Sequence, residues 1–257
     1  MRRTPLIALA LGAVLTGAAL AGCASGAGGG SSPAPTTSAA ASPGAGADAG
    51  VDVAVAWLDG GAAVAVLTRG SSSCVPGLMV TGEMPPLQVT LLGNLDAACT
   101  RDAVLRGDAV AVTVDPSLDL EVRVSASTEG TDAAGTPGAD GAVGGDVVLP
   151  GAADLAGATP VAEGEPSAGW ATVDDVLALS TWGSSGCRPV VQDAAVTAPG
   201  EITVTLAEPA PDLVCTADFA RRVSVIDVPD AEQDVAYELI LTGDGYDATR
   251  MAIAGGN

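Results

Sequence analysis

A nine-residue segment that occurs twice constrains the fold of this chain more than any other feature. Residues 68–76 read Thr-Arg-Gly-Ser-Ser-Ser-Cys-Val-Pro, and residues 181–189 read Thr-Trp-Gly-Ser-Ser-Gly-Cys-Arg-Pro. Positions 68 and 181 differ by 113, and the same difference carries Trp57 onto Trp170. Self-similarity at a long, constant offset indicates repeated structural units. The sequence therefore predicts an internal duplication.

The second part of each copy carries further matches. Val-Thr-Leu at 89–91 returns at 204–206, and Cys-Thr-Arg-Asp at 99–102 returns as Cys-Thr-Ala-Asp at 215–218. The last offset, 116, places Arg106 opposite Arg222, so each copy has an arginine four residues after its aspartate. This spacing predicts that each aspartate and arginine pair across one helical turn, in a structural role.

Strict alternation of apolar and polar residues predicts β-strands through both copies. The alternating segments are 87–91, 108–114, 118–124, 202–206 and 235–241. Such segments are typical of half-buried strands, and Thr-Gly-Asp-Gly at 242–245 indicates a hairpin turn. We predict an all-β chain of two tandem, homologous, small antiparallel β-sandwich or barrel-like domains, with one disulfide in each. The repeated Trp57 and Trp170 are expected in the core.

Four of the five cysteines are distributed evenly between the copies. Cys74 and Cys99 lie in the first copy, and Cys187 and Cys215 lie in the second. Four cysteines allow three pairings, but duplication favours a disulfide within each copy. A zinc site is disfavoured because the chain has no histidine and no Cys-x-x-Cys spacing.

The fifth cysteine closes an apolar leader. A basic Met-Arg-Arg start precedes an apolar run from Leu6 to Leu20, which has the length of a secretory signal and is too short for a stable transmembrane helix. The run ends in Leu-Ala-Gly-Cys at 20–23, which resembles the lipobox of bacterial lipoproteins. The resemblance implies that residues 1–22 are a signal peptide and that Cys23 becomes the lipid-modified N-terminus. It also implies anchoring at the extracytoplasmic face of the cell membrane.

Composition divides the rest of the chain. Residues 23–50 are almost entirely Gly, Ala, Ser, Pro and Thr, which is typical of a disordered tether. We expect a first β domain over 51–150, a linker over 151–168 and a second β domain over 169–257. Residues 126–145 break the strand pattern, and we interpret them as a flexible insertion in the last hairpin of the first domain. The alternative is that the whole span 126–168 is a linker.

Charge narrows the range of partners. The formal charge is −21 for the full chain, with no lysine and ten arginines, and it becomes −23 when Arg2 and Arg3 leave with the leader. Nucleic acid is excluded as a partner because a phosphate backbone requires clustered basic residues. Anionic headgroups would repel the chain, so we expect its membrane association to depend on the lipid.

No catalytic machinery is evident in the motifs. A nucleophilic serine in Gly-Ser-Ser-x-Cys would need a base such as histidine or lysine, and the chain has neither. We interpret this motif as a turn whose hydroxyls bond the backbone beside a disulfide. The acidic clusters do not match a calcium-binding loop. We therefore predict no catalytic residue, no metal ligand and no cofactor.

Trp182 differs from the other repeated positions because its counterpart is Arg69, so the shared fold does not require a tryptophan there. Trp182, with nearby Arg188, is a candidate ligand contact, although partial burial of Trp182 in the core is the favoured interpretation. In layout the chain resembles uncharacterised surface lipoproteins of high-GC Gram-positive bacteria. The leading hypothesis is a non-catalytic binding module for an envelope protein or a small ligand. The alternatives are an envelope hydrolase with paired carboxylates and a structural spacer.

Overall fold

The described part of the chain is built from β-strands. The computed structural model describes residues 53–82, 85–93, 99–126, 144–232 and 235–256. Within these ranges it contains fourteen strands and two short 3-10 helices, so the all-β prediction is confirmed. The same residues contain no helix long and apolar enough to cross a membrane.

The first copy supplies seven strands and one 3-10 helix. The strands are β1 (Val53–Leu58), β2 (Ala63–Gly70), β3 (Gly77–Val80), β4 (Leu87–Leu92), β5 (Val104–Ala111), β6 (Leu120–Ala126) and β7 (Gly145–Leu149), and η1 (Asp59–Gly61) follows β1. The strands expected at 87–91 and 118–124 correspond to β4 and β6, while the strand expected at 108–114 starts and ends earlier, as β5.

The second copy also supplies seven strands, after η2 (Ala153–Leu155). They are β8 (Ser167–Trp170), β9 (Val176–Gly183), β10 (Val191–Ala198), β11 (Glu201–Leu206), β12 (Ala220–Asp227), β13 (Glu238–Gly243) and β14 (Tyr246–Ala254). The strand expected at 202–206 corresponds to β11, and the hairpin expected at 242–245 joins β13 to β14. The strand expected at 235–241 begins three residues late, at Glu238.

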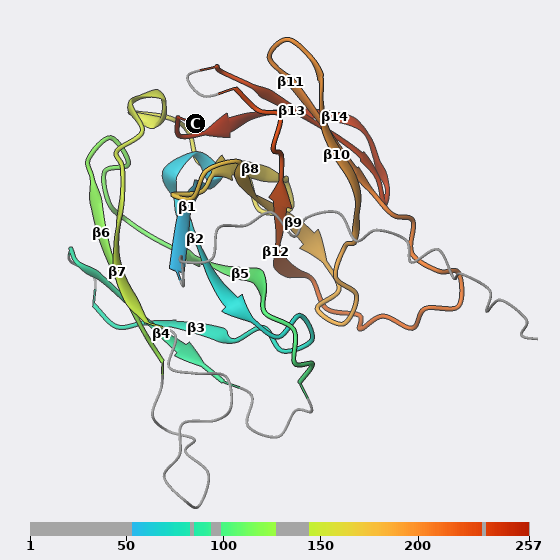
Figure 1. Cartoon of the computed structure of the whole chain (residues 1–257), viewed down its shortest axis with the longest axis horizontal. Helices are drawn as coiled ribbons and strands as arrows, with labels where there is room; N and C mark the ends of the chain where they lie inside the picture. Colours follow the sequence, from blue (N-terminus) through green and yellow to red (C-terminus); the bar gives the residue numbers. More distant parts are fainter. Residues whose placement is uncertain (1–52, 83–84, 94–98, 127–143, 233–234, 257) are drawn as a thin grey trace, which may run out of the picture. The chain divides into compact units, whose positions relative to one another are not determined.

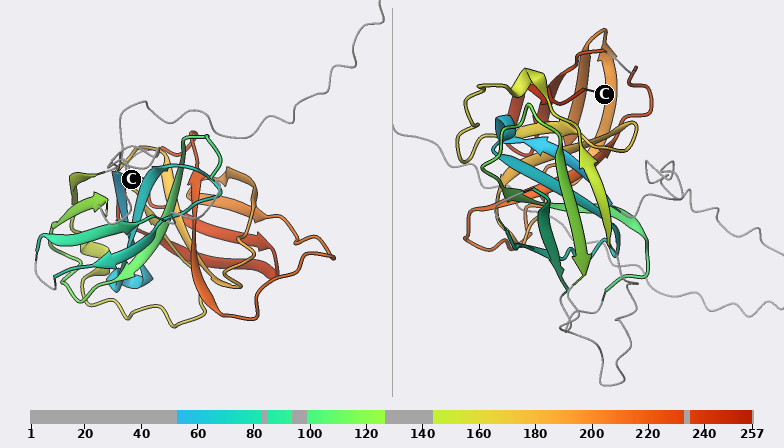
Figure 2. Two further views of the ribbon diagram at one scale, coloured as in Figure 1. Left: turned by 90° about the horizontal axis from the view of Figure 1, so that it is seen from below. Right: turned by 90° about the vertical axis from the view of Figure 1, so that its left-hand side faces the viewer.

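Strand order within the two copies corresponds strand for strand. The first copy contributes β1-β2-β5 to one sheet and forms a second, four-stranded sheet, β3-β4-β6-β7. In the second copy, β8-β9-β12 are neighbours in the order of β1-β2-β5. Likewise, β10-β11-β13-β14 are neighbours in the order of β3-β4-β6-β7. The first copy runs from blue to yellow-green and the second from gold to red (Figures 1 and 2).

Hydrogen bonding does not separate the two copies into independent sandwiches. One ten-stranded sheet runs β1-β2-β5-β12-β9-β8-β14-β13-β11-β10, so it contains strands of both copies. The copies meet where β5 pairs antiparallel with β12, at Gly107 and Val223. The predicted all-β class and the two predicted disulfides are therefore found. The predicted separation into two tandem sandwiches is not, because one sheet contains strands of both copies.

Six strands of this sheet also return on themselves. A β-bridge joins Ala56 of β1 to Ala171, directly after β8, and Thr172 donates its N–H to the Val55 carbonyl at 2.9 Å. Pairing therefore runs β1-β2-β5-β12-β9-β8 and back to β1. A closed ring of so few strands has little interior room, and five alanines pack there with Leu58, Leu67 and two valines. Ala54, Ala56, Ala63, Ala65 and Ala178 are at most 1% exposed.

Two further apolar cores lie on the other side of these strands. Trp57 packs with strands of the first copy, and its indole N–H donates to the Pro150 carbonyl at 2.9 Å. Trp170 packs with strands of the second copy and meets the Tyr237 ring edge-on, with centroids 6.2 Å apart. The two tryptophans are 1% and 5% exposed, which confirms their predicted place in the core.

Several predictions concern residues outside the described ranges. The signal peptide at 1–22, Cys23 and the tether at 23–50 all lie there, as do residues 127–143 of the expected insertion at 126–145. The strands at the two ends of that insertion, β6 and β7, pair antiparallel with each other.

Candidate functional site

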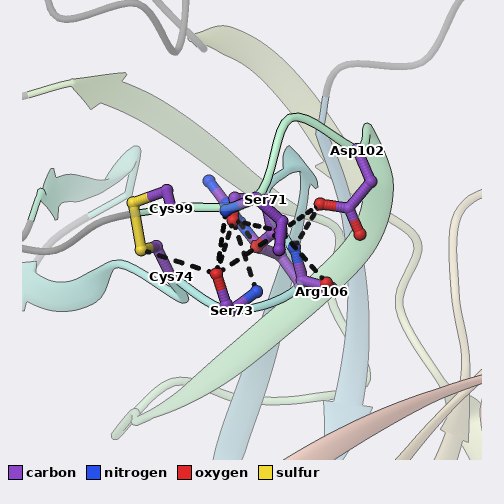
Figure 3. The surroundings of a disulfide bond; sticks show 8 residues. Ser71, Ser73, Cys74, Cys99, Asp102 and Arg106 are labelled. Carbon is purple, nitrogen blue, oxygen red and sulfur yellow. Dashed lines mark hydrogen bonds between the residues drawn. A yellow bond between two sulfur atoms is a disulfide. The ribbon is translucent and has the colours of Figure 1, made fainter.

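Both predicted disulfides are present. Cys74 is bonded to Cys99 and Cys187 to Cys215, with 5.5 Å between the Cα atoms in each case. Each bridge ties the loop after the second strand of its copy to the loop before the strand that carries the buried arginine. Figure 3 shows the bridge of the first copy. The pairing within each copy, expected from the duplication, is confirmed.

Hydroxyl groups surround the first disulfide. The Ser71 and Thr100 hydroxyls lie 2.8 Å apart, and the Thr100 N–H donates to the Ser73 hydroxyl at 3.0 Å. The Ser72 N–H donates to Asp102 at 3.1 Å, and the Thr100 hydroxyl also donates to this carboxylate. Figure 3 shows this network beside the bridge. The interpretation of Gly-Ser-Ser-x-Cys as a hydrogen-bonded turn is therefore confirmed.

Arg106 is hydrogen-bonded to the same turn. It lies on β5, is 9% exposed, and donates from Nη1 to the Ser71 carbonyl at 2.8 Å. A Cβ at Gly70 would lie 2.2–2.4 Å from the guanidinium atoms, so a side chain there would displace the guanidinium. The predicted helical pairing of Asp102 with Arg106 is wrong, because Arg106 is on a strand and bonds a carbonyl while Asp102 bonds the turn.

The second copy repeats this arrangement. The Ser185 N–H donates to Asp218 at 3.1 Å, and the Ser184 and Thr216 hydroxyls lie 2.7 Å apart. Arg222 donates to the Ser184 carbonyl at 2.8 Å, and a Cβ at Gly183 would lie 2.2 Å from its guanidinium. The helical pairing predicted here is wrong for the same reason. Because both copies make these contacts, we assign the hydrogen bonds around each disulfide a structural role.

The aspartates of these turns have strongly lowered pKa values. Hydrogen bonds from Ser72 and Thr100 lower the pKa of Asp102 from its ordinary value of 3.8 to about 2. Those from Ser185 and Thr216 lower the pKa of Asp218 equally. A lowered folded-state pKa adds stability that is complete above the ordinary pKa and is lost as the pH falls through the folded value.

We therefore expect the double variant Asp102→Asn/Asp218→Asn to be less stable than the parent at neutral pH. In acid, where the parent's carboxylates are protonated, the two chains should be equally stable. The difference in unfolding temperature between parent and variant should shrink as the pH falls from about 4 to about 2. Thermal unfolding at a series of pH values, with the disulfides intact, measures this. A difference that stays constant down to pH 2 would contradict the role assigned to the carboxylates.

Residues that differ between the copies form a second cluster. Trp182, Phe219 and Arg221 stand where the first copy has Arg69, Ala103 and Leu105 at the offsets of 113 and 116. The Trp182 and Phe219 rings stack with centroids 5.4 Å apart, and the Arg221 guanidinium lies 4.9 Å from the centre of the Trp182 ring. We call Trp182, Phe219 and Arg221 the aromatic cluster.

A buried carboxylate fixes the aromatic cluster to the first copy. Asp59 Oδ2 forms an ion pair with Arg221 Nη2 at 2.5 Å. The Asp59 side chain is 8% exposed and the Arg221 side chain is 23% exposed. The Ser167 hydroxyl donates to the other oxygen of Asp59 at 2.5 Å, while the Asp59 N–H donates to that hydroxyl at 3.2 Å. The counterpart of Asp59 in the second copy is Thr172, so this contact too is specific to one side.

The side chains of the aromatic cluster differ in accessibility. Trp182 is partly buried, in agreement with the favoured interpretation, and Phe219 stacks on it with 61% of its own surface exposed. Arg188 is exposed, and the interaction found for it is electrostatic, with Asp108. The structure therefore joins Trp182 to Phe219 and Arg221 rather than to Arg188.

Phe219 and Arg221 were not predicted from the sequence, although a signal for them exists. The offset of 116 pairs them with Ala103 and Leu105, and such a difference within a conserved Cys-Thr-x-Asp context marks a position that the shared fold does not require.

Two cavities lie elsewhere in the described part of the chain. One of about 400 Å³ is lined mainly by small and apolar residues, including Gly60, Val112 and Pro160. The other, of about 260 Å³, includes Leu118 and Asp119. Within the described residues, no group of three or more Cys, Asp and Glu side chains gathers as a metal site would require. No protein-family model, curated protein or solved structure matches this chain.

Proposed function

We propose that this protein is a lipid-anchored, extracytoplasmic binding module without catalytic activity, and that the aromatic cluster is its contact surface. The observation that carries the proposal is the asymmetry between the copies. The main contacts of the disulfide turns recur in both copies: the aspartate bond to a serine N–H, the serine–threonine hydroxyl pair and the arginine bond to a serine carbonyl. The aromatic cluster occurs in one copy and leaves Phe219 exposed. An exposed aromatic ring supported by a second ring is typical of interaction sites.

The anchor and the domain layout belong to the same proposal. Cleavage before Cys23 and lipid attachment to it would place residues 23–50 as a tether between the membrane and the strands. About 27 residues of this composition span on the order of 30 Å on average. The binding module then stands clear of the anionic headgroups that its charge of −23 disfavours.

We further infer that the two copies arose by duplication and correspond to domains at 51–150 and 169–257. Their common strand order supports this, as do their equivalent disulfides and their matching arginine–glycine contacts. Antiparallel pairing of β6 with β7 supports the insertion within a hairpin over a linker that begins at residue 126.

Chemical cross-linking on intact cells, followed by affinity purification of the tagged chain, tests the binding function. Phe219→Ala is the informative variant, because Trp182 is partly buried and its replacement would disturb packing. Leu118→Ala is the matched control, since Leu118 is 64% exposed and Phe219 is 61% exposed. We expect a specific cross-linked protein with the parent and the control, and its loss with Phe219→Ala. Equal capture by all three chains, or no specific capture by the parent, would refute the proposal.

A further inference from the structure

The surroundings of Phe219 indicate the charge of what it binds. One face of the ring lies on Trp182. Beside the ring, a Cβ at Gly164 would lie 3.5 Å from its Cζ atom, so the segment around Gly164 borders it. The residues on either side of this glycine, Glu163 and Glu165, are both exposed.

The local charge at this border is negative. Asp218 directly precedes Phe219, and its pKa of about 2 keeps it ionised at neutral and mildly acidic pH. The arginine of the aromatic cluster, Arg221, is paired with Asp59. Glu163 and Glu165 thus flank the glycine that borders the Phe219 ring, and Asp218 precedes Phe219 in the chain, so the charges next to the ring in these two segments are negative.

We propose that the aromatic cluster binds a basic polypeptide segment, with an arginine or lysine of the partner on the outer face of Phe219 and its charge paired with the flanking glutamates. This inference rests on the proposed binding function and specifies its partner. A cation over an exposed aromatic ring contributes about 0.5–1 kcal/mol, and more when desolvated. The charge of −23 on the mature chain would also steer a basic partner toward it.

The exposure of Phe219, 61% of its surface, favours a polypeptide over a small cation. Small ligands bind in concave sites that bury most of their surface. The cavities of about 400 and 260 Å³ are lined by other residues and include no member of the aromatic cluster. A polypeptide segment can instead spread over an open surface and add contacts on both sides of the ring.

A fluorescence titration of the full-length protein tests the inference, with a synthetic hexapeptide of alternating alanine and arginine as the probe. Trp57 and Trp170 are 1% and 5% exposed, so the signal that responds to the peptide comes chiefly from Trp182. The same hexapeptide with glutamine in place of arginine is the neutral comparison. We expect saturable binding of the arginine peptide and none of the glutamine peptide at the same concentrations.

Two double variants separate a site from general attraction to a negative protein. Glu163→Gln/Glu165→Gln removes the flanking charges, and Asp193→Asn/Asp247→Asn removes two exposed charges elsewhere. Both change the net charge by two. We expect the Kd to rise about fivefold or more in the first variant and in Phe219→Ala, and less than about twofold in the control. Equal weakening by the two double variants, or unchanged binding by Phe219→Ala, would overturn the proposal.

The two experiments distinguish failure of the basic-partner inference from failure of the proposed binding function. If cross-linking on cells depends on Phe219 but the arginine peptide binds no better than the glutamine peptide, the aromatic cluster is a contact surface and the inference of a basic partner is wrong. If neither depends on Phe219, both proposals fail.

Discussion

The variant Gly169→Ala is expected to lose about 3 kcal/mol or more of unfolding free energy. A Cβ at this position would lie 1.9 Å from the Trp57 carbonyl oxygen and 3.1 Å from its carbon. These are backbone atoms of β1, so relief requires β8 to move away from β1. That movement would open the ring of six strands at its closing contact, where Ala56 bridges to Ala171.

Gly93→Ala is the matched control for this variant, because a Cβ at Gly93 would meet nothing within 4 Å. Its unfolding free energy should stay within about 0.5 kcal/mol of the parent. Urea unfolding followed by tryptophan fluorescence gives both values. If Gly169→Ala were as stable as Gly93→Ala, β1 and β8 would not approach each other in solution as they do here.

The second large effect is expected from Asp59→Asn, which removes the charge that Arg221 meets while keeping the size of the side chain. Removing one partner of a buried ion pair leaves the other charge uncompensated and typically costs about 3–5 kcal/mol. Arg221 is 23% exposed, so solvent screens part of this loss, and we expect about 2–4 kcal/mol.

The same variant should change the environment of Trp182. Arg221 lies over its ring, and release of Arg221 from Asp59 removes what holds the guanidinium there. A shift in tryptophan emission should therefore accompany the loss of stability. Asp154→Asn, at an exposed aspartate, is the control and should change neither property. A stable Asp59→Asn chain with unchanged emission would contradict the buried pair.

Sequence patterns identify the outer strands of this fold better than the inner ones. β4 and β6 have one buried and one exposed face, so their residues alternate and the prediction finds them. β1 and most of β2 are buried on both faces, and such strands read as continuous apolar runs without a period. The pairing of β5 with β12 also leaves no local signal, because it depends on Gly107 meeting a strand of the other copy.

Some features of the site can likewise be predicted from the sequence, and others cannot. The sequence repeat favoured the disulfide pairing that is found, and hydroxyl-rich loops beside cysteines indicated the turns. The arginine–glycine contacts could not be foreseen, because a buried arginine packed on a glycine requires knowing that β2 and β5 are neighbours. Trp182 was found because its counterpart is an arginine, whereas the supporting Asp59 has no sequence pattern that links it to Arg221.

The central claim is that features shared by the copies hold the fold and that the aromatic cluster binds. The most direct measurement is site-specific photo-cross-linking on intact cells, with a photoreactive phenylalanine derivative at position 219 or at position 103. The two positions are exposed counterparts in the same loop of the two copies, so they form a matched pair. We predict a specific cross-linked protein from position 219 and none from position 103. Equal cross-linking from both positions, or none from either, would contradict the account.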